Sequence, residues 1–129
     1  MTATWKPEKY NSVSVYIVAG NAQRVIDFLK SVFDATPLRR FDAPDGKIMH
    51  AEVRIDDTVV MLADASGAYP AFPVWLHVYV PDAQATYKRA LAAGGVSVQE
   101  PVNKPGDPDL RGGVKDPCGN TWWMSTQLG

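Results

Sequence analysis

The sequence contains a single cysteine, Cys118, among its 129 residues. One thiol cannot form a disulfide within the chain, so a disulfide-stabilised scaffold is excluded and we expect a cytoplasmic protein. The sequence also lacks an excess of basic residues, because 13 Lys and Arg stand against 14 Asp and Glu. A phosphate backbone is bound by surplus positive charge, so we expect no nucleic-acid partner.

Long apolar runs are absent as well. Residues 59–63 form one of the longest such runs, far below the roughly 20 residues that span a bilayer. Residues 1–7 lack the apolar stretch of a secretory signal, so we expect no membrane partner. Hydrophobic residues make up 46% and charged residues 21% of the chain, which indicates one globular domain over residues 1–129.

An internal repeat organises the chain. Residues 21–23 (Asn-Ala-Gln) recur 61 positions later as residues 82–84 (Asp-Ala-Gln). The same offset relates Ser14 to Trp75, His50 to Arg111 and Val53 to Val114, and an offset of 62 relates Met61 to Trp123. The repeat divides the chain into two modules, residues 10–64 and 74–127.

Each module has the pattern of strand, helix and three further strands. In the first, alternation predicts a strand over 13–18 and helical spacing of apolar residues predicts a helix that Asn21 caps. A short strand follows near 38–41, and residues 47–55 and 58–63 form a hairpin. The second module repeats this order with a strand over 74–80, a helix after Asp82 and a strand over 96–102. A turn over 116–120 then joins its last two strands.

Four sequence strings resemble a known superfamily. They are KIMHAEVRI at 47–55, VVMLAD at 59–64, VPD at 80–82 and GVKDPCGNTWW at 113–123. Together with the repeat, they resemble the vicinal oxygen chelate superfamily of glyoxalase I, extradiol dioxygenases and bleomycin resistance proteins, in particular its PhnB-like branch. The resemblance implies an α+β fold in which tandem βαβββ modules form a curved mixed sheet around a cavity, with helices on the outer face. It also implies a homodimer, because relatives pair such modules within or between chains.

Strand alternation sorts side chains into two faces. The aliphatic set requires cover by the helices: Val13, Val15, Ile17, Val60, Leu62, Leu76, Val78, Val80, Trp122 and Met124. The opposite face mixes aromatic and polar side chains, which is typical of a small-molecule cavity. From it we predict ten ligand-binding residues: Ser14, Tyr16, His50, Glu52, Met61, Trp75, His77, Tyr79, Arg111 and Trp123.

The resemblance also places four metal ligands on cavity-facing strands. Carried over by position, they fall on Ser14, Met61, Trp75 and Trp123. None of these is a carboxylate or imidazole donor, so we expect a metal-free cavity without a cofactor.

Several polar residues of this face have two interpretations. His50 and Glu52, with His77, could form a relocated divalent-metal centre or an acid–base pair, or His50 and Glu52 could simply hydrogen-bond each other or Arg54. Arg111 could anchor an anionic group or pair with Asp109 or Glu100. Trp75 and Trp123 could fill the interior or stack on a planar ligand.

These observations favour a small-molecule-binding protein of the glyoxalase and bleomycin-resistance type with a metal-free cavity. One alternative is a metal-dependent lyase or isomerase of the glyoxalase type that uses His50 and Glu52 as relocated ligands or catalytic groups. The other is a non-catalytic scaffold in which the two indoles close the cavity.

Overall fold

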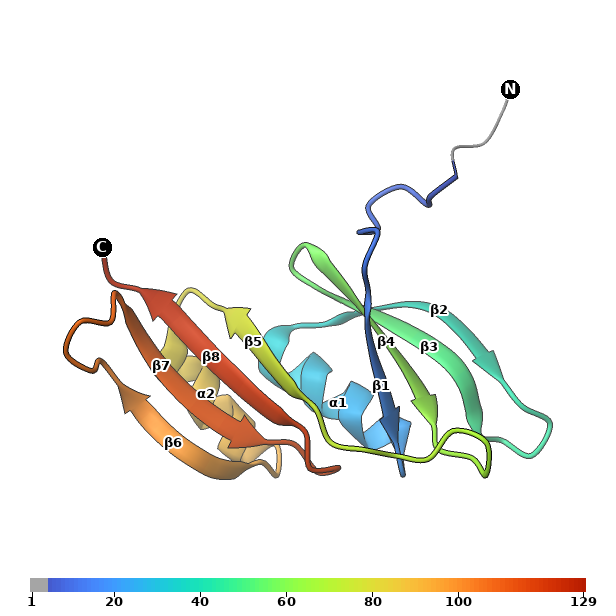
Figure 1. Cartoon of the computed structure of the whole chain (residues 1–129). Coiled ribbons are helices and arrows are strands. Elements are labelled where there is room, and N and C mark those ends of the chain that lie inside the picture. The colour runs from blue at the N-terminus through green and yellow to red at the C-terminus, as the bar shows by residue number, and fades with distance from the viewer. Residues whose placement is uncertain (1–4) are drawn as a thin grey trace.

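Two strand–helix–strand–strand–strand modules follow one another along the chain in the computed structural model, which describes residues 5–129 (Figure 1). The elements of the first module are β1 (Val15–Ala19), α1 (Ala22–Phe33), β2 (Thr36–Asp42), β3 (Ile48–Ile55) and β4 (Thr58–Asp64). Those of the second are β5 (Trp75–Tyr79), α2 (Ala83–Ala92), β6 (Val96–Val102), β7 (Asp109–Lys115) and β8 (Thr121–Gln127).

The strands form two four-stranded mixed sheets of the same topology. Their orders are β1-β4-β3-β2 and β5-β8-β7-β6, and in each the first strand pairs in parallel with the last while the other neighbours are antiparallel. The α+β class and the tandem modules predicted from the sequence are thereby confirmed. The strands form two separate sheets in one chain rather than one continuous curved sheet.

Each helix begins at a polar cap that the sequence indicates. The Asn21 side chain accepts from the Arg24 amide at 3.3 Å, and the Asp82 side chain accepts from the Ala85 amide at 3.0 Å. Such caps satisfy amides that have no partner within the helix. The last strand of each module also holds its helix, because Asp64 in β4 accepts from the first amide of α1 at 2.7 Å. Thr126 in β8 does the same for α2 at 2.8 Å.

Both helices lie on one side of the sheets, next to each other, and leave the opposite sheet faces open (Figure 1). Arg89 of α2 donates to the Val32 carbonyl of α1, and Phe33 of α1 lies 5.5 Å from the Trp122 ring of β8. The helix-facing positions follow the predicted alternation. Ile17, Val60, Leu62, Trp122 and Met124 are buried, and Leu76, Val78 and Val80 are partly buried against the core.

The expectation for the start of the first strand is wrong. Val13 is 86% exposed and lies outside β1, which begins at Val15. Val15 itself is 36% exposed. The apolar alternation therefore extends two residues beyond the region that the helix covers.

A buried polar cluster fixes the orientation of Trp122. Its indole Nε1 donates to Asp116 Oδ2 at 2.9 Å, and the Asn120 amide donates to the same oxygen at 3.0 Å. The other Asp116 oxygen accepts from the backbone of Cys118 and Asn120 at 2.8 and 3.2 Å. A buried carboxylate with several donors is satisfied, whereas one that loses a donor is costly.

None of the helices within residues 5–129 has the length and apolar character needed to cross a membrane.

We predict that Trp122→Phe lowers the free energy of unfolding by about 2–4 kcal/mol, because it removes a hydrogen bond to a buried carboxylate and leaves a cavity in the core. Urea denaturation followed by circular dichroism measures the loss. Trp5→Phe is the matched control, since Trp5 is 85% exposed. Equal stability of the two variants would contradict this account of the core.

Candidate functional site

The faces of the two sheets that point away from the helices carry large aromatic side chains in the open. Trp75 is 75% exposed, Tyr79 is 63% exposed and Tyr16 is 43% exposed. Monomeric proteins seldom leave so much aromatic surface in contact with water, and such patches mark binding sites.

The open face of the second sheet forms a cavity of about 470 Å³. Its lining combines aromatic and polar residues: Trp75, His77, Gln99, Val102, Lys104, Asp107, Arg111 and Trp123. The Trp75 and Trp123 rings meet edge to face, with centroids 5.4 Å apart and planes at 63°. This is one of the favoured arrangements of aromatic pairs.

The indole of Trp123 packs directly over Gly113, the residue paired with it on the neighbouring strand. Gly113 of β7 pairs with Trp123 of β8, as the hairpin register predicts. A Cβ at Gly113 would lie 2.7 Å from the Cε3 and Cζ3 atoms of the indole. Glycine in a strand is normally unfavourable, and here it makes room for the close approach of a ring.

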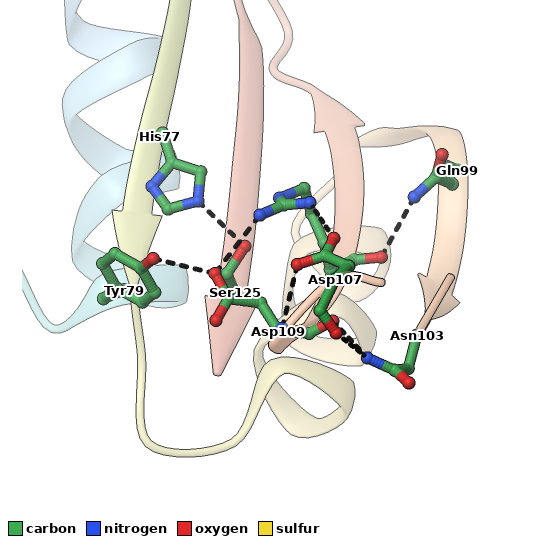
Figure 2. A network of polar contacts seen from close by, with 8 residues as sticks. His77, Tyr79, Gln99, Asn103, Asp107, Asp109 and Ser125 are labelled. Carbon is green, nitrogen blue, oxygen red and sulfur yellow. Dashed lines mark hydrogen bonds and ion pairs between the residues drawn. The ribbon is translucent and has the colours of Figure 1, made fainter. Parts of the chain in front are cut away.

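We call the residues that line this cavity the wall. A network of polar contacts joins several of them to Tyr79, Asn103, Asp109 and Ser125 (Figure 2). His77 Nε2 and Ser125 Oγ lie 2.9 Å apart, and the Tyr79 hydroxyl donates to Asp109 Oδ2 at 2.8 Å. Arg111 donates to Asp109 at 3.2 Å and to Asp107 at 2.5 Å. The proposed Arg111–Asp109 pair is confirmed, whereas Glu100 takes no part in the ion pairs recorded for residues 5–129.

Asp107 is a site residue that the sequence analysis missed. It lies in the loop before β7, where an Asx-type contact from the Asp109 amide at 2.9 Å holds its side chain. Its spacing of four residues from Arg111 would indicate an ion pair only in a helix, and loop residues do not follow strand alternation, so no signal in the sequence pointed to it. Asn103 donates to the carbonyls of Asp107 and Asp109 at 2.8 Å each and fixes this loop.

The network shifts several pKa values. The backbone hydrogen bond from Asp109 and the Arg111 guanidinium lower the pKa of the Asp107 carboxyl against the effect of burial. The hydrogen bond to Asp109 raises the pKa of the Tyr79 hydroxyl. Burial, with the nearby Arg111 charge, lowers the pKa of His77. At neutral pH the wall therefore carries an uncharged imidazole and an ion-paired arginine.

One donor of the site has no partner. Within residues 5–129, the Trp123 indole Nε1 is the one buried side-chain nitrogen or oxygen without a hydrogen bond. Buried polar groups are nearly always paired, so an unpaired one calls for an explanation.

The open face of the first sheet carries a different cluster. His50 Nε2 lies 2.7 Å from Glu52 Oε2, and His50 Nδ1 lies 3.0 Å from the Tyr16 hydroxyl. The Tyr10 hydroxyl donates to Glu52 Oε1 at 2.5 Å. The interpretation in which His50 and Glu52 hydrogen-bond each other is therefore confirmed, and Arg54 bonds the Lys9 carbonyl instead.

Tyr10 is the second residue that sequence reasoning missed, because it lies outside every repeated element. The segment before β1 lies against the first sheet and lines a cavity of about 240 Å³ that includes Ser14, Glu52 and Met61. Arg39 lies 5.3 Å from the Tyr10 ring.

Glu52 is held as a carboxylate. Burial would raise its pKa, but hydrogen bonds from His50 and Tyr10 outweigh burial, so the pKa lies below its ordinary value. The hydrogen bond to Glu52 raises the pKa of the Tyr10 hydroxyl, and burial together with the Glu52 charge raises that of Tyr16.

The ten predicted ligand-binding residues come half from each module. Those of the first are Ser14, Tyr16, His50, Glu52 and Met61, and those of the second are Trp75, His77, Tyr79, Arg111 and Trp123. Tyr16 of the first module lines one further cavity, of about 440 Å³, together with Trp75 and His77 of the second. The structure does not bring His77 to His50 and Glu52, because His77 contacts Ser125 on the other sheet. The relocated metal centre of these three residues is therefore not formed within one chain.

The residues at the superfamily's metal positions do not fit a metal. Ser14 and Met61 line one cavity, and two indoles, which are not metal donors, line the other. Residues 5–129 also contain no group of three or more His, Cys, Asp or Glu side chains arranged to hold an ion.

We predict that stability depends on pH through His77. Its pKa is lowered below 6.5, so below that pH the unfolded chain takes up a proton that the folded chain resists. The stabilising effect is complete above pH 6.5 and is lost as the pH falls below it. Urea denaturation at a series of pH values should show a shallower loss for His77→Gln, which has no imidazole to protonate. Parallel curves for the two proteins would contradict the assignment.

Comparisons with known proteins agree with this geometry. Residues 10–124 match the family described as the Glyoxalase/Bleomycin resistance protein/Dioxygenase superfamily. An uncharacterized protein from Mycobacterium bovis is 34% identical over 122 residues, which cover 86% of this chain and 80% of that protein.

Two solved structures share the fold. TioX from Micromonospora sp. ML1 is 27% identical, with a TM-score of 0.75 over 92% of this chain and 99% of its own. TnmS3 from Streptomyces sp. CB03234, described as an antibiotic binding protein, is 18% identical, with a TM-score of 0.70 over 92% of this chain and 99% of its own. The repeat, the two sheets and the match over residues 10–124 show that the chain belongs to the glyoxalase, bleomycin resistance protein and dioxygenase superfamily.

Proposed function

We propose that the chain is a small-molecule-binding protein whose ligand lies against the Trp75–Trp123 wall of the second sheet, in a cavity without a resident metal. The observation that carries the proposal is the edge-to-face indole pair on an open cavity of about 470 Å³. Cavities of roughly 300–1,000 Å³ lined by aromatic residues and a few polar groups are typical of ligand sites. The description of the structurally similar TnmS3 as an antibiotic binding protein also supports it.

The two alternative functions fit the site less well. A metal-dependent lyase or isomerase needs donors that Ser14, Met61, Trp75 and Trp123 do not supply. A scaffold with a closed cavity needs indoles that fill it, yet Trp75 is 75% exposed. Elemental analysis of the dialysed protein separates the enzyme from the binding protein: about one transition metal per chain, lost in His50→Ala, would favour the enzyme.

We further propose that the protein is a homodimer in which the second copy completes the site. Each chain carries two open faces of different character, with the Glu52–His50 cluster on one and the indole wall on the other. In a two-fold arrangement, the first sheet of one copy covers the second sheet of its partner, and the same contact occurs twice. Both cavities are then enclosed by one interface.

The dimer has a simple test. Sedimentation equilibrium should give about twice 14.1 kDa. Phe41 lies on the open face of the first sheet, 6.3 Å from His50, and is 58% exposed. Phe41→Asp should shift the protein toward the monomer, because it places a charge in an apolar interface. Lys30→Asp on the exposed side of α1 is the control and should leave the mass unchanged. A monomeric wild-type protein would overturn this arrangement.

Ligand binding is tested with quinoline, a planar molecule that is uncharged at neutral pH. We expect it to shift the indole N–H signals of Trp75 and Trp123 in ¹H–¹⁵N NMR spectra of the wild-type protein. Loss of one aromatic contact is worth about 0.5–1.5 kcal/mol beyond area burial, so Trp123→Ala should weaken binding at least about twofold to tenfold. Trp75 then serves as the reporter signal.

Trp122→Phe is the matched control for this experiment. It removes the neighbouring indole on the helix-facing side of β8 and should leave quinoline binding unchanged. If Trp122→Phe abolishes binding while Trp123→Ala does not, the site lies on the other side of the sheet from the one proposed.

A further inference from the structure

We propose that the ligand belongs to the class of uncharged planar aromatic molecules with a hydrogen-bond acceptor at the ring edge, and that the Trp123 indole N–H binds this acceptor. The inference rests on the proposed function and names the chemistry of its ligand. It starts from the unpaired Nε1 of Trp123 in the wall of the second-sheet cavity.

The position of the indole shows which way the N–H lies. The Cε3 and Cζ3 atoms of Trp123 lie against Gly113 of β7, so the opposite edge, which carries Nε1, is turned toward β5. Trp75 of β5 is the ring packed on that side, at 5.4 Å. Because Trp75 is 75% exposed, it can turn aside without disturbing the core. A ligand that takes its place meets an aromatic face and one free donor.

Most of the other polar side chains around this cavity already have hydrogen-bond partners. His77 bonds Ser125, and Gln99 donates to the Arg111 carbonyl at 3.1 Å. Arg111 donates to both Asp107 and Asp109, and the hydroxyl of Tyr79 also donates to Asp109. Lys104 also lines the cavity, as a charged donor on a flexible stem, so the Trp123 N–H is the uncharged donor that a strand holds in place to orient a ligand.

Charge selects against an anionic ligand. The two carboxylates beside Arg111 neutralise its guanidinium and would repel a carboxylate or phosphate brought to it. Lys104, on the same rim, has its charge near Asp107, where it lowers the pKa of that carboxyl. Asp107 and Asp109 in turn have their partners, so the wall offers no free carboxylate to a cation. The interpretation of Arg111 as an anion anchor is thereby replaced by one in which it holds the rim together.

Three probes built on the same two-ring shape separate these possibilities. Quinoline is neutral and carries a ring-nitrogen acceptor, naphthalene has the same shape without an acceptor, and 2-naphthoate adds a negative charge. At equal concentrations, set by the solubility of naphthalene, we expect quinoline to bind most tightly to the wild-type protein. Its binding should move the Trp123 indole proton signal downfield, as a hydrogen bond does, whereas naphthalene should not.

Trp123→Phe removes the N–H and keeps an aromatic ring. Loss of one neutral hydrogen bond corresponds to about a threefold to tenfold weaker affinity, so this variant should lose most of its preference for quinoline over naphthalene. Trp122→Phe keeps the Trp123 N–H and should keep the preference. The downfield shift in the wild-type protein tests the inference even if Trp123→Phe folds poorly.

The outcomes distinguish this inference from the function on which it rests. Equal binding of quinoline and naphthalene, or tightest binding of 2-naphthoate, would overturn the inference and leave a small-molecule site in place. If no probe perturbs the Trp75 or Trp123 signals, the proposed function fails together with the ligand class.

Discussion

The burial of residue 122 in the core sets which side chains of β8 face the helices and which face the open side of the sheet. The Trp122 indole is fully buried, donates to Asp116 and contacts Phe33 of α1, so this position cannot turn outward without losing all three. Successive side chains of a strand alternate between faces, and Trp123 must therefore lie on the open face. β5 lies parallel to β8 and follows the same alternation. His77 is therefore paired with Trp123, and Trp75, two residues before His77, lies on the same face. A buried aromatic residue at position 122, with or without the indole N–H, thus sets the side of β8 on which Trp123 lies.

The two modules use one topology for different surfaces. In the first, the segment before β1 lies on the open sheet, and the hydroxyl of Tyr10 with the ring of His50 satisfies the buried carboxylate of Glu52. In the second, no corresponding segment lines the cavity. Its lining residues come from the four strands β5, β6, β7 and β8 and from the loop before β7. A carboxylate in a dry site needs donors, whereas an indole wall is stable when open to a ligand. The difference in polarity is consistent with a chain segment that contacts the Glu52 end of one open face, while the indole wall of the other has no such segment against it.

Much of the fold and part of the candidate site can be predicted from the periodicity of the sequence, whereas the irregular segments cannot. The caps at Asn21 and Asp82, the hairpin registers and the faces of β4, β5 and β8 are local consequences of alternation and turn chemistry, so they could be predicted. Tyr10 and Asp107 lie in irregular segments, where strand alternation does not predict the direction of a side chain. Tyr10 bonds Glu52, which is far away in the sequence, and Asp107 bonds Arg111 in the strand that follows its loop. The separation of the two sheets depends on how the modules pack through their helices, a property that strand patterns do not encode. The assignment to the PhnB-like branch stays a prediction.

The place of Trp123 in the second module depends on the size of the residue paired with it on the neighbouring strand. Glu52 of β3 pairs with Met61 of β4, and at the equivalent places of the second module Gly113 of β7 pairs with Trp123 of β8. A ring as large as indole fits beside β7 only where its neighbour has no side chain, because a Cβ there would lie 2.7 Å from it. The absence of a side chain at Gly113 is therefore what makes room for Trp123. A Gly113→Glu change would fit only if Trp123 also became smaller, so the two positions constrain each other and keep the second face aromatic.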